Sequence, residues 1–284
     1  MSFDEAEISR NRGMPVELYL FQYGPDAAHH YAYTSAEEEV EFDNIVYVPT
    51  PMQRDGTKSS GTLDKSSESV RTGALSEAAE LFRIYPPSQE VALIIRQGHL
   101  NDPDEEFPVT WAGRVLSCKW EDSQVELTCE SIATSMKRTG LRRHWQYGCP
   151  HALYRGNAEG GCHADKVRAT VTGTVTAVSG NTLSLAEGWN GAFPKEKFRA
   201  GTLEWTNAQG VSEARTILRL DTAADTFTLS GLARDIAVDG EVSVVLGCNH
   251  QMDDCADLHL VINDFGGDPW IPRKNPFVGT NNYY

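Results

Sequence analysis

The chain has 284 residues, of which 40% are hydrophobic and 23% charged, and its formal net charge is -15 at pH 7. This length predicts two or three compact units rather than one. The negative charge argues against sequence-specific DNA binding, because binding to phosphates relies on cationic groups. No apolar run approaches the roughly 20 residues that a membrane span needs. The polar, acidic N-terminus lacks the features of a secretory signal, so we expect a protein that folds in a cytoplasm without inserting into a membrane.

Short strands dominate the prediction for the first half of the chain. Residues 16–23 are rich in β-branched and aromatic residues, which is typical of a strand. Residues 40–48 carry an Asp-Asn pair between two apolar runs, which predicts a hairpin. Further strands are predicted at residues 91–97, 109–120 and 124–130. Residues 131–141 are expected to form a short helix, and residues 1–145 a β-rich domain.

A second β-rich region begins at residue 166. Residues 166–185 alternate Val and Thr and turn at the Ser-Gly-Asn sequence 179–181, which predicts another hairpin. Further strands are predicted at residues 202–206, 211–220, 226–230 and 241–247. Residues 166–247 are therefore expected to form a small β domain inserted between two pairs of cysteines. The segment that begins LHLVINDF at Leu258 predicts one more strand, followed by a tail rich in Pro, Gly and aromatic residues.

Four of the six cysteines flank this predicted insertion. An inserted domain usually begins and ends at neighbouring points, so the four thiols are expected to converge. In a reducing compartment, converging cysteines indicate a metal site more than disulfides. Four thiolates can hold zinc or an iron–sulfur cluster, and the wide spacing of these pairs favours the cluster. The ligands predicted for either cofactor are Cys149, Cys162, Cys248 and Cys255, in a small irregular four-cysteine metal-binding domain made of residues 146–165 and 248–284.

The remaining cysteines and two nearby histidines have simpler interpretations. Cys118 and Cys129 each fall within a predicted strand, and we expect both to be core residues. His163 and His250 lie beside predicted ligands, where a histidine more often hydrogen-bonds around the site than binds the metal.

Catalysis by a cysteine nucleophile with a histidine base is an alternative. The candidate pairs are Cys162 with His163 and Cys149 with His151. Adjacent residues rarely face each other productively, and the sequence has no nucleophile elbow, phosphate-binding loop, dinucleotide motif or zinc-protease motif. We therefore expect a protein that is not an enzyme.

A carbohydrate-binding module is a further alternative. It would be centred on the predicted insertion, with Trp189 and Trp205 as platforms on which sugar rings stack.

Three stretches carry a resemblance to the baseplate hub or tail-tip family of long-tailed phages and gene transfer agents. They are YTSAEEEVEFDNIVYVPTPMQRDG (33–56), RHWQYGCPHALYRG (143–156) and CADLHLVINDFGGDPWIPRKNPF (255–277). The most specific motif is FGGxPWIPxKNPF, which predicts a C-terminal docking tail of turns and exposed aromatic residues. The resemblance covers nearly the whole chain. The tail-tip protein of phage lambda is a more distant relative in this family. Its cysteine-bound [4Fe-4S] cluster implies the same cofactor at the four cysteines, with zinc as the alternative.

The resemblance also implies a structural function. Each subunit would contain β-barrel-like hub domains, and three copies would form a ring at the tail tip of the virion, after folding in the cytoplasm of the bacterial host. The ring would bind a distal tail or tail-tube protein and a central fibre or tip protein, and DNA would pass through its lumen without specific binding. The acidic residues Glu37, Glu38, Glu39 and Glu41 are candidates for the lumen wall. The alternatives are a tail-associated cysteine hydrolase acting on the cell wall and a carbohydrate-binding tip module.

Overall fold

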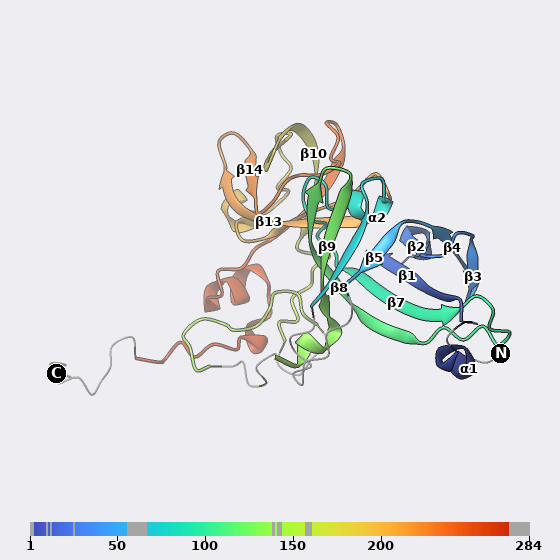
Figure 1. The fold of residues 1–284 in the computed structure, drawn as a ribbon. Helices are drawn as coiled ribbons and strands as arrows, with labels where there is room; N and C mark the ends of the chain where they lie inside the picture. Colours follow the sequence, from blue (N-terminus) through green and yellow to red (C-terminus); the bar gives the residue numbers. More distant parts are fainter. Residues whose placement is uncertain are drawn as a thin grey trace, which may run out of the picture. The chain divides into compact units, whose positions relative to one another are not determined.

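A computed structural model describes residues 3–9, 11, 13–24, 26–55, 67–137, 140, 144–156 and 161–272. The chain divides into two compact units, residues 1–139 and 140–284. Both units are built on β-structure (Figure 1). Every helix in the described ranges is too short or too polar to cross a membrane.

In the described part of the N-terminal unit, nine strands form one sheet, in the order β3-β4-β2-β1-β7-β8-β9-β6-β5. The strands are β1 (Pro15–Tyr23), β2 (His30–Thr34), β3 (Val40–Phe42), β4 (Ile45–Pro49), β5 (Met52–Arg54), β6 (Ser67–Gly73), β7 (Val91–His99), β8 (Val109–Glu121) and β9 (Gln124–Ser131). Two short helices, α1 (Phe3–Ile8) and α2 (Glu77–Glu80), accompany the sheet. Neighbouring strands are antiparallel except for β2 and β4, which are parallel.

Sequence patterns locate most of these strands because side chains of a strand alternate between two faces. The predicted hairpin at residues 40–48 is confirmed as β3 and β4, which are joined by Asp43 and Asn44. Both joining residues have positive φ, 54° and 59°, which is the geometry of a tight two-residue hairpin turn. The strands predicted at residues 16–23, 91–97, 109–120 and 124–130 are confirmed as β1, β7, β8 and β9.

The prediction for the end of this unit is confirmed only in part. A 3₁₀ helix covers Ile132–Lys137 instead of a longer helix over residues 131–141. The rest of that segment lies largely outside the described residues.

In the described part of the second unit, six strands close into a barrel in the order β10-β11-β14-β13-β12-β15. They are β10 (Thr170–Ser179), β11 (Thr182–Leu185), β12 (Thr202–Thr206), β13 (Ser212–Asp221), β14 (Thr226–Leu229) and β15 (Glu241–Val245). Pairing of β10 with β15 closes the barrel. The pairing register shifts at Val175/Ala177 in β10 and at Ile217/Arg219 in β13, and such irregularities help strands to bend around a barrel.

The barrel confirms the mainly β prediction for this part of the chain. The hairpin expected at residues 166–185 is present as β10 and β11, and Gly180 in its turn has a positive φ of 59°. The interior is filled by apolar residues, among which Phe198, Leu203 and Phe227 are fully buried. The further division of the second unit into an inserted domain and a cysteine domain stays a prediction.

The prediction of a strand from Leu258 onwards is wrong. Here the chain forms a π-helix at Asp254–Leu258 and a 3₁₀ helix at Ile262–Asp264. Leu258 and His259 are both buried although they are adjacent, so the segment lacks the alternating burial of a strand. Its backbone groups bond locally instead, for example His259 N–H to the carbonyl of Asp254 at 2.9 Å.

Candidate metal centre

The first and second cysteine pairs meet through a direct contact between their loops. Cys149 N–H donates to the carbonyl oxygen of His250 at 2.8 Å. In return, the Nδ1 of His250 donates to the carbonyl oxygen of Cys149 at 2.9 Å. There is little room for a side chain at Gly148 beside this contact, since a Cβ there would lie 3.2 Å from the carbonyl oxygen of His250. The loop of Cys149 and the loop that runs from Cys248 to Cys255 therefore lie side by side.

The four predicted ligands also influence one another electrostatically. Burial raises the pKa of the Cys255 thiol to about 12, and negative charge on Cys248, Cys149 and Cys162 adds to this effect. The pKa of Cys248 is likewise raised, first by burial, and charge on Cys162 and Cys149 contributes. Thiolates at these positions would repel one another, and a bound cation would offset that repulsion.

The surroundings of the four sulfur atoms suit thiolate ligands. Cys149, Cys162 and Cys255 are buried and Cys248 is partly buried. All four are free thiols. Backbone N–H groups point at two of the sulfur atoms: Gly266 N–H donates to Cys149 Sγ at 3.4 Å, and His250 N–H donates to Cys248 Sγ at 3.3 Å. Such hydrogen bonds stabilise negative charge on sulfur.

Metal binding itself is not confirmed by the geometry. Among the described residues, no group of three or more His, Cys, Asp or Glu side chains is arranged so that it could hold a metal ion. The metal-binding role of the four cysteines therefore stays a prediction.

The barrel holds the cysteine segments through several side chains. Tyr154 OH donates to the carbonyl of Leu246 at 2.8 Å, and Arg168 donates to the carbonyl of Leu258 at 3.0 Å. Leu258 itself packs in the core of the barrel. Lys197, from the 3₁₀ helix Lys195–Phe198, pairs with the buried Asp254 at 2.6 Å. The barrel and the two cysteine segments thus share contacts within the second unit.

The two glycines of the FGG motif are required by close packing. A Cβ on Gly266 would lie 2.5 Å from the Nε2 of His151, and one on Gly267 would lie 2.6 Å from the carbonyl oxygen of Tyr147. Both distances are far below normal contact, so any larger residue would push the C-terminal segment away from the loop of Cys149.

The histidines of the proposed catalytic pairs are engaged elsewhere. His151 donates from Nδ1 to the carbonyl oxygen of Asp264 at 2.9 Å. His163 Nδ1 lies 3.2 Å from a carboxylate oxygen of the same Asp264. The structure therefore provides both imidazoles with acceptors other than the neighbouring thiols, which gives the hydrolase alternative no support.

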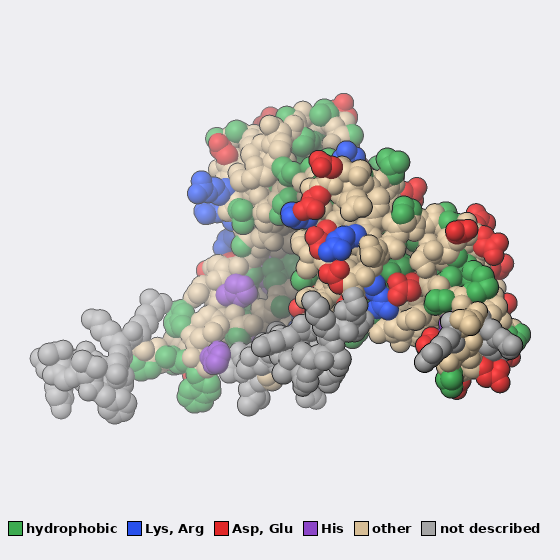
Figure 2. Space-filling model, in the orientation of Figure 1, with side chains coloured by type: hydrophobic (Ala, Val, Ile, Leu, Met, Phe, Trp, Pro, Cys, Tyr) green, Lys and Arg blue, Asp and Glu red, His purple; other side chains and the backbone are tan. Residues whose placement is uncertain are grey.

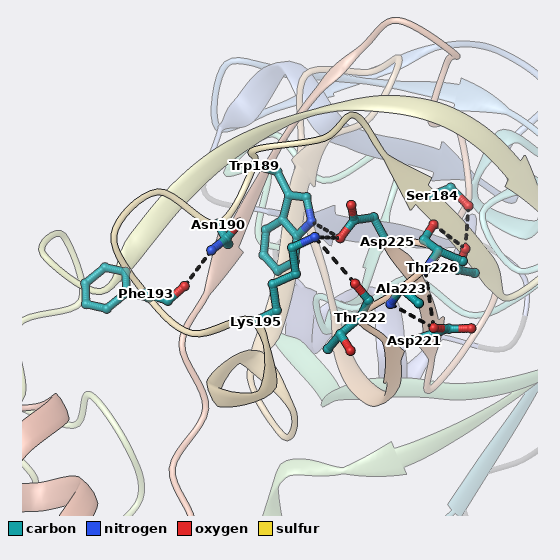
Figure 3. Close-up of polar contacts among 11 residues, drawn as sticks. Ser184, Trp189, Asn190, Phe193, Lys195, Asp221, Thr222, Ala223, Asp225 and Thr226 are labelled. Atoms are coloured by element: carbon teal, nitrogen blue, oxygen red, sulfur yellow. Dashed lines mark hydrogen bonds and ion pairs between the residues drawn. The ribbon is translucent and has the colours of Figure 1, made fainter.

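The tryptophans proposed as sugar platforms are buried in the barrel. Trp189 is 4% exposed and Trp205 is 5% exposed. Trp189 donates from its indole N–H to Asp225 at 2.9 Å, and Lys195 pairs with the same carboxylate at 2.6 Å (Figure 3). Trp205 donates to the carbonyl of Arg234 at 2.8 Å. Neither ring has a free face for a sugar, so the carbohydrate-binding alternative loses the residues on which it depended.

The other two cysteines lie in strands, and the prediction that both are core residues is confirmed for Cys129 and wrong for Cys118. Cys129 in β9 is fully buried and Cys118 in β8 is partly buried. Burial raises the pKa of Cys118 to about 11 and that of Cys129 to about 12, so both thiols stay protonated at neutral pH.

Two exposed tryptophans lie on segments that the structure brings together. Asp268 N–H donates to the carbonyl of Gln146 at 2.9 Å, which brings the loop of the first cysteine pair beside the C-terminal motif. Trp145 and Trp270 flank this bond in the sequence and are 91% and 86% exposed. Trp270 belongs to the FGGxPWIPxKNPF motif, but nothing in the sequence linked it to Trp145.

Comparisons with known proteins support the resemblance of this chain to phage tail-type proteins. Residues 196–275 match the family described as "Phage conserved hypothetical protein BR0599". This range includes Cys248, Cys255, Lys197 and Asp254.

A solved structure matches the full length of the chain. It is the "Virion of native gene transfer agent (GTA) particle", one chain of which superimposes with a TM-score of 0.75, covering 100% of this chain and 96% of that chain. The two sequences are 18% identical, so this match concerns the fold. An uncharacterized protein of Xylella fastidiosa (strain 9a5c) is 22% identical over 188 residues, which cover 62% of this chain and 38% of that protein.

Proposed function

We propose that this chain is a structural subunit of the virion of a long-tailed phage or gene transfer agent, with the role of a baseplate hub or tail-tip protein. The full-length fold match to a chain of a gene transfer agent virion carries the proposal. The phage family match over residues 196–275 supports it independently, because that comparison rests on sequence.

In this role the protein acts by binding and not by catalysis. Three copies form a ring that joins the tail tube to the central tip or fibre. The partners are other copies of this chain, a distal tail or tail-tube protein and the tip or fibre protein. In the described residues, the N-terminal unit brings a large sheet to this ring and the second unit a closed barrel.

The four cysteines hold a [4Fe-4S] cluster in this proposal, with zinc as the alternative cofactor. Their free and largely buried thiols, their mutual electrostatic influence and the two N–H donors to sulfur all fit such a centre. When bound, the cofactor would crosslink two segments that are far apart in the sequence, and its binding energy would add to the folding energy of this region.

The exposed tryptophans Trp145 and Trp270 suit contact with a neighbouring virion protein. Tryptophan buries a large area at low entropic cost and is enriched at the centre of protein interfaces. Single exposed apolar side chains are common on monomers, but two nearly fully exposed tryptophans on hydrogen-bonded segments are a stronger signal.

In the proposed ring, acidic residues of the N-terminal unit line the lumen. Glu37, Glu38, Glu39 and Glu41 are all exposed, and acidic side chains gather over β3 and β4 in Figure 2. A negative wall would keep DNA from adhering as it passes, because it repels phosphates.

Localisation and assembly test the proposed function together. Antibodies against this chain should label the tail tips of purified particles, and the purified protein with its tail-tube partner should give rings with threefold symmetry by electron microscopy. Labelling of the capsid, or absence of the chain from purified particles, would overturn the hub role. Rings of another symmetry would overturn only the trimer.

A further inference from the structure

Asp254 is a buried carboxylate between the two cysteines of the second pair. It precedes Cys255 directly and is 3% exposed. One carboxylate oxygen accepts the backbone N–H of Asn249, the residue after Cys248, at 2.9 Å. The other accepts Lys197 Nζ at 2.6 Å. Burying a carboxylate costs free energy unless the group is paired and hydrogen-bonded, so the burial of Asp254 depends on its ion pair with Lys197.

Lys197 contacts the cysteine segment at both ends. Its carbonyl oxygen accepts the N–H of Gly247, the residue before Cys248, at 2.9 Å. Its side chain reaches Asp254, next to Cys255, through the ion pair already described. Lys197 therefore contacts a neighbour of each cysteine of the pair, through its backbone at one end and its side chain at the other.

The position of Lys197 is itself set by the barrel core. It lies in the 3₁₀ helix Lys195–Phe198, and the last residue of that helix, Phe198, is fully buried. Phe198 packs edge-on against Trp189, with 4.8 Å between the ring centroids. The lysine therefore extends from a part of the chain that is held by the core, and its side chain reaches Asp254 from there.

We propose that Lys197 is a positioning residue for the candidate metal centre, holding the segment from Cys248 to Cys255 in place through Asp254. This inference deepens the proposed function, since it concerns the same four-cysteine site. The barrel then has a role in this site, because it carries the lysine that positions two of the four predicted ligands, Cys248 and Cys255. Lys197 acts on this segment through its ion pair with Asp254.

The same 3₁₀ helix offers a matched control. Lys195 pairs with Asp225 at 2.6 Å, a carboxylate that is itself largely buried and also accepts the indole N–H of Trp189. This contact lies within the barrel and involves none of the cysteine segments (Figure 3). Lys195→Met thus removes an ion pair of the same type, from the same helix, without releasing Asp254.

The test is the rate at which each cysteine is alkylated in the reduced, metal-free protein, resolved by mass spectrometry. In Lys197→Met, Cys248 and Cys255 should react about tenfold faster than in the parent protein, because the segment opens locally more often. Lys195→Met should leave these two rates unchanged, and Lys197→Arg should restore most of the protection. Asp254→Asn should accelerate alkylation of Cys248 and Cys255 as Lys197→Met does. This second variant keeps the test available if Lys197→Met fails to fold.

The outcomes separate this inference from the cofactor proposal. Unchanged alkylation of Cys248 and Cys255 in both Lys197→Met and Asp254→Asn would overturn the positioning role, whatever metal the parent protein binds. Equal acceleration in Lys195→Met would also overturn it, because the effect would then be general loosening of the barrel. Faster alkylation in a protein that binds neither iron nor zinc would support the positioning role and contradict the cofactor alone.

Discussion

Cys149 and His250 are 101 residues apart in the sequence and are joined by a hydrogen bond in each direction. One is a backbone bond, from Cys149 N–H to the carbonyl of His250, and the other runs from the His250 imidazole to the carbonyl of Cys149. Because the imidazole donates from Nδ1 to a backbone carbonyl, His250 supports the loop that carries a predicted ligand. This is the supporting role that the sequence suggested for it.

Metal analysis is the most direct check on the proposed centre. Protein purified without oxygen should contain about four irons and a similar amount of sulfide per chain, and should absorb broadly at about 400 nm, as expected for a cubane cluster with four thiolate ligands. One zinc per chain without iron would contradict the cluster and retain the metal site. Absence of both metals would contradict the site.

Replacing single cysteines should separate ligands from core residues. Cys248→Ser or Cys255→Ser should destabilise the second unit by more than about 3 kcal/mol, because metal binding is coupled to folding. Cys118→Ser is the control, since Cys118 lies in β8 of the other unit and is only partly buried. Hydrogen exchange, followed in the unit that carries each substitution, would measure the difference. Equal effects of the three substitutions would contradict the assignment.

The stability of the barrel should fall in acid through Asp225. Burial acts to raise the pKa of Asp225, but hydrogen bonds from Lys195 and Trp189 outweigh it and leave the pKa below its ordinary value. A carboxyl whose pKa is lower in the folded state stabilises the fold at pH values above its unfolded pKa of about 3.9. This stabilisation is lost as the pH falls through the folded-state pKa. Asp225→Asn should therefore weaken the barrel at pH 7 and make little difference in strong acid.

Hydrogen exchange of the amides of β11 and β14 would follow this effect, because these strands pair beside Asp225. In a Lys195→Met background the effect of Asp225→Asn should shrink, since the two residues act as a pair. A difference between Asp225→Asn and the parent protein that persists undiminished in strong acid would contradict this interpretation.

Buried and exposed tryptophans should respond to truncation in opposite ways. Trp189→Ala should destabilise the barrel by about 3–5 kcal/mol, as expected for removal of a buried aromatic ring. Trp270→Ala and Trp145→Ala should leave the midpoint of thermal unfolding nearly unchanged and weaken incorporation into particles. Normal incorporation of the Trp145→Ala, Trp270→Ala double variant would remove the proposed docking role of these residues.

The proposed lumen predicts a direction for the negative charge. In the structure of an assembled ring, the potential should be more negative on the inner wall than on the outer wall, and Glu37, Glu38, Glu39 and Glu41 should contribute to the inner one. Replacing all four by Gln should slow DNA release from particles without preventing assembly. A neutral or basic lumen would mean that the acidity serves solubility alone.

The sequence by itself determined most of the strands, because apolar alternation and turn residues are local signals. The hairpin at Asp43-Asn44 and the one at Gly180 could be placed from a few residues each. Prediction from the sequence failed where polar side chains are buried. In β6, Glu68 and Thr72 are buried beside Val70, and Arg54 lies 3.6 Å from the Glu68 carboxylate, so a strand with two buried polar side chains gave no apolar pattern.

Only the tertiary structure decided how the candidate site is built. The four cysteines could be proposed from the sequence because cysteine is rare and its chemistry is specific. The residues that hold them, such as Lys197 and Asp254, are common charged residues, and most such residues are solvated. Their role depends on a contact between segments that are 57 residues apart, and on burial that excludes water from the carboxylate. The burial of Trp189 and Trp205 was likewise decided by the tertiary structure, because closure of the barrel places both rings in its core.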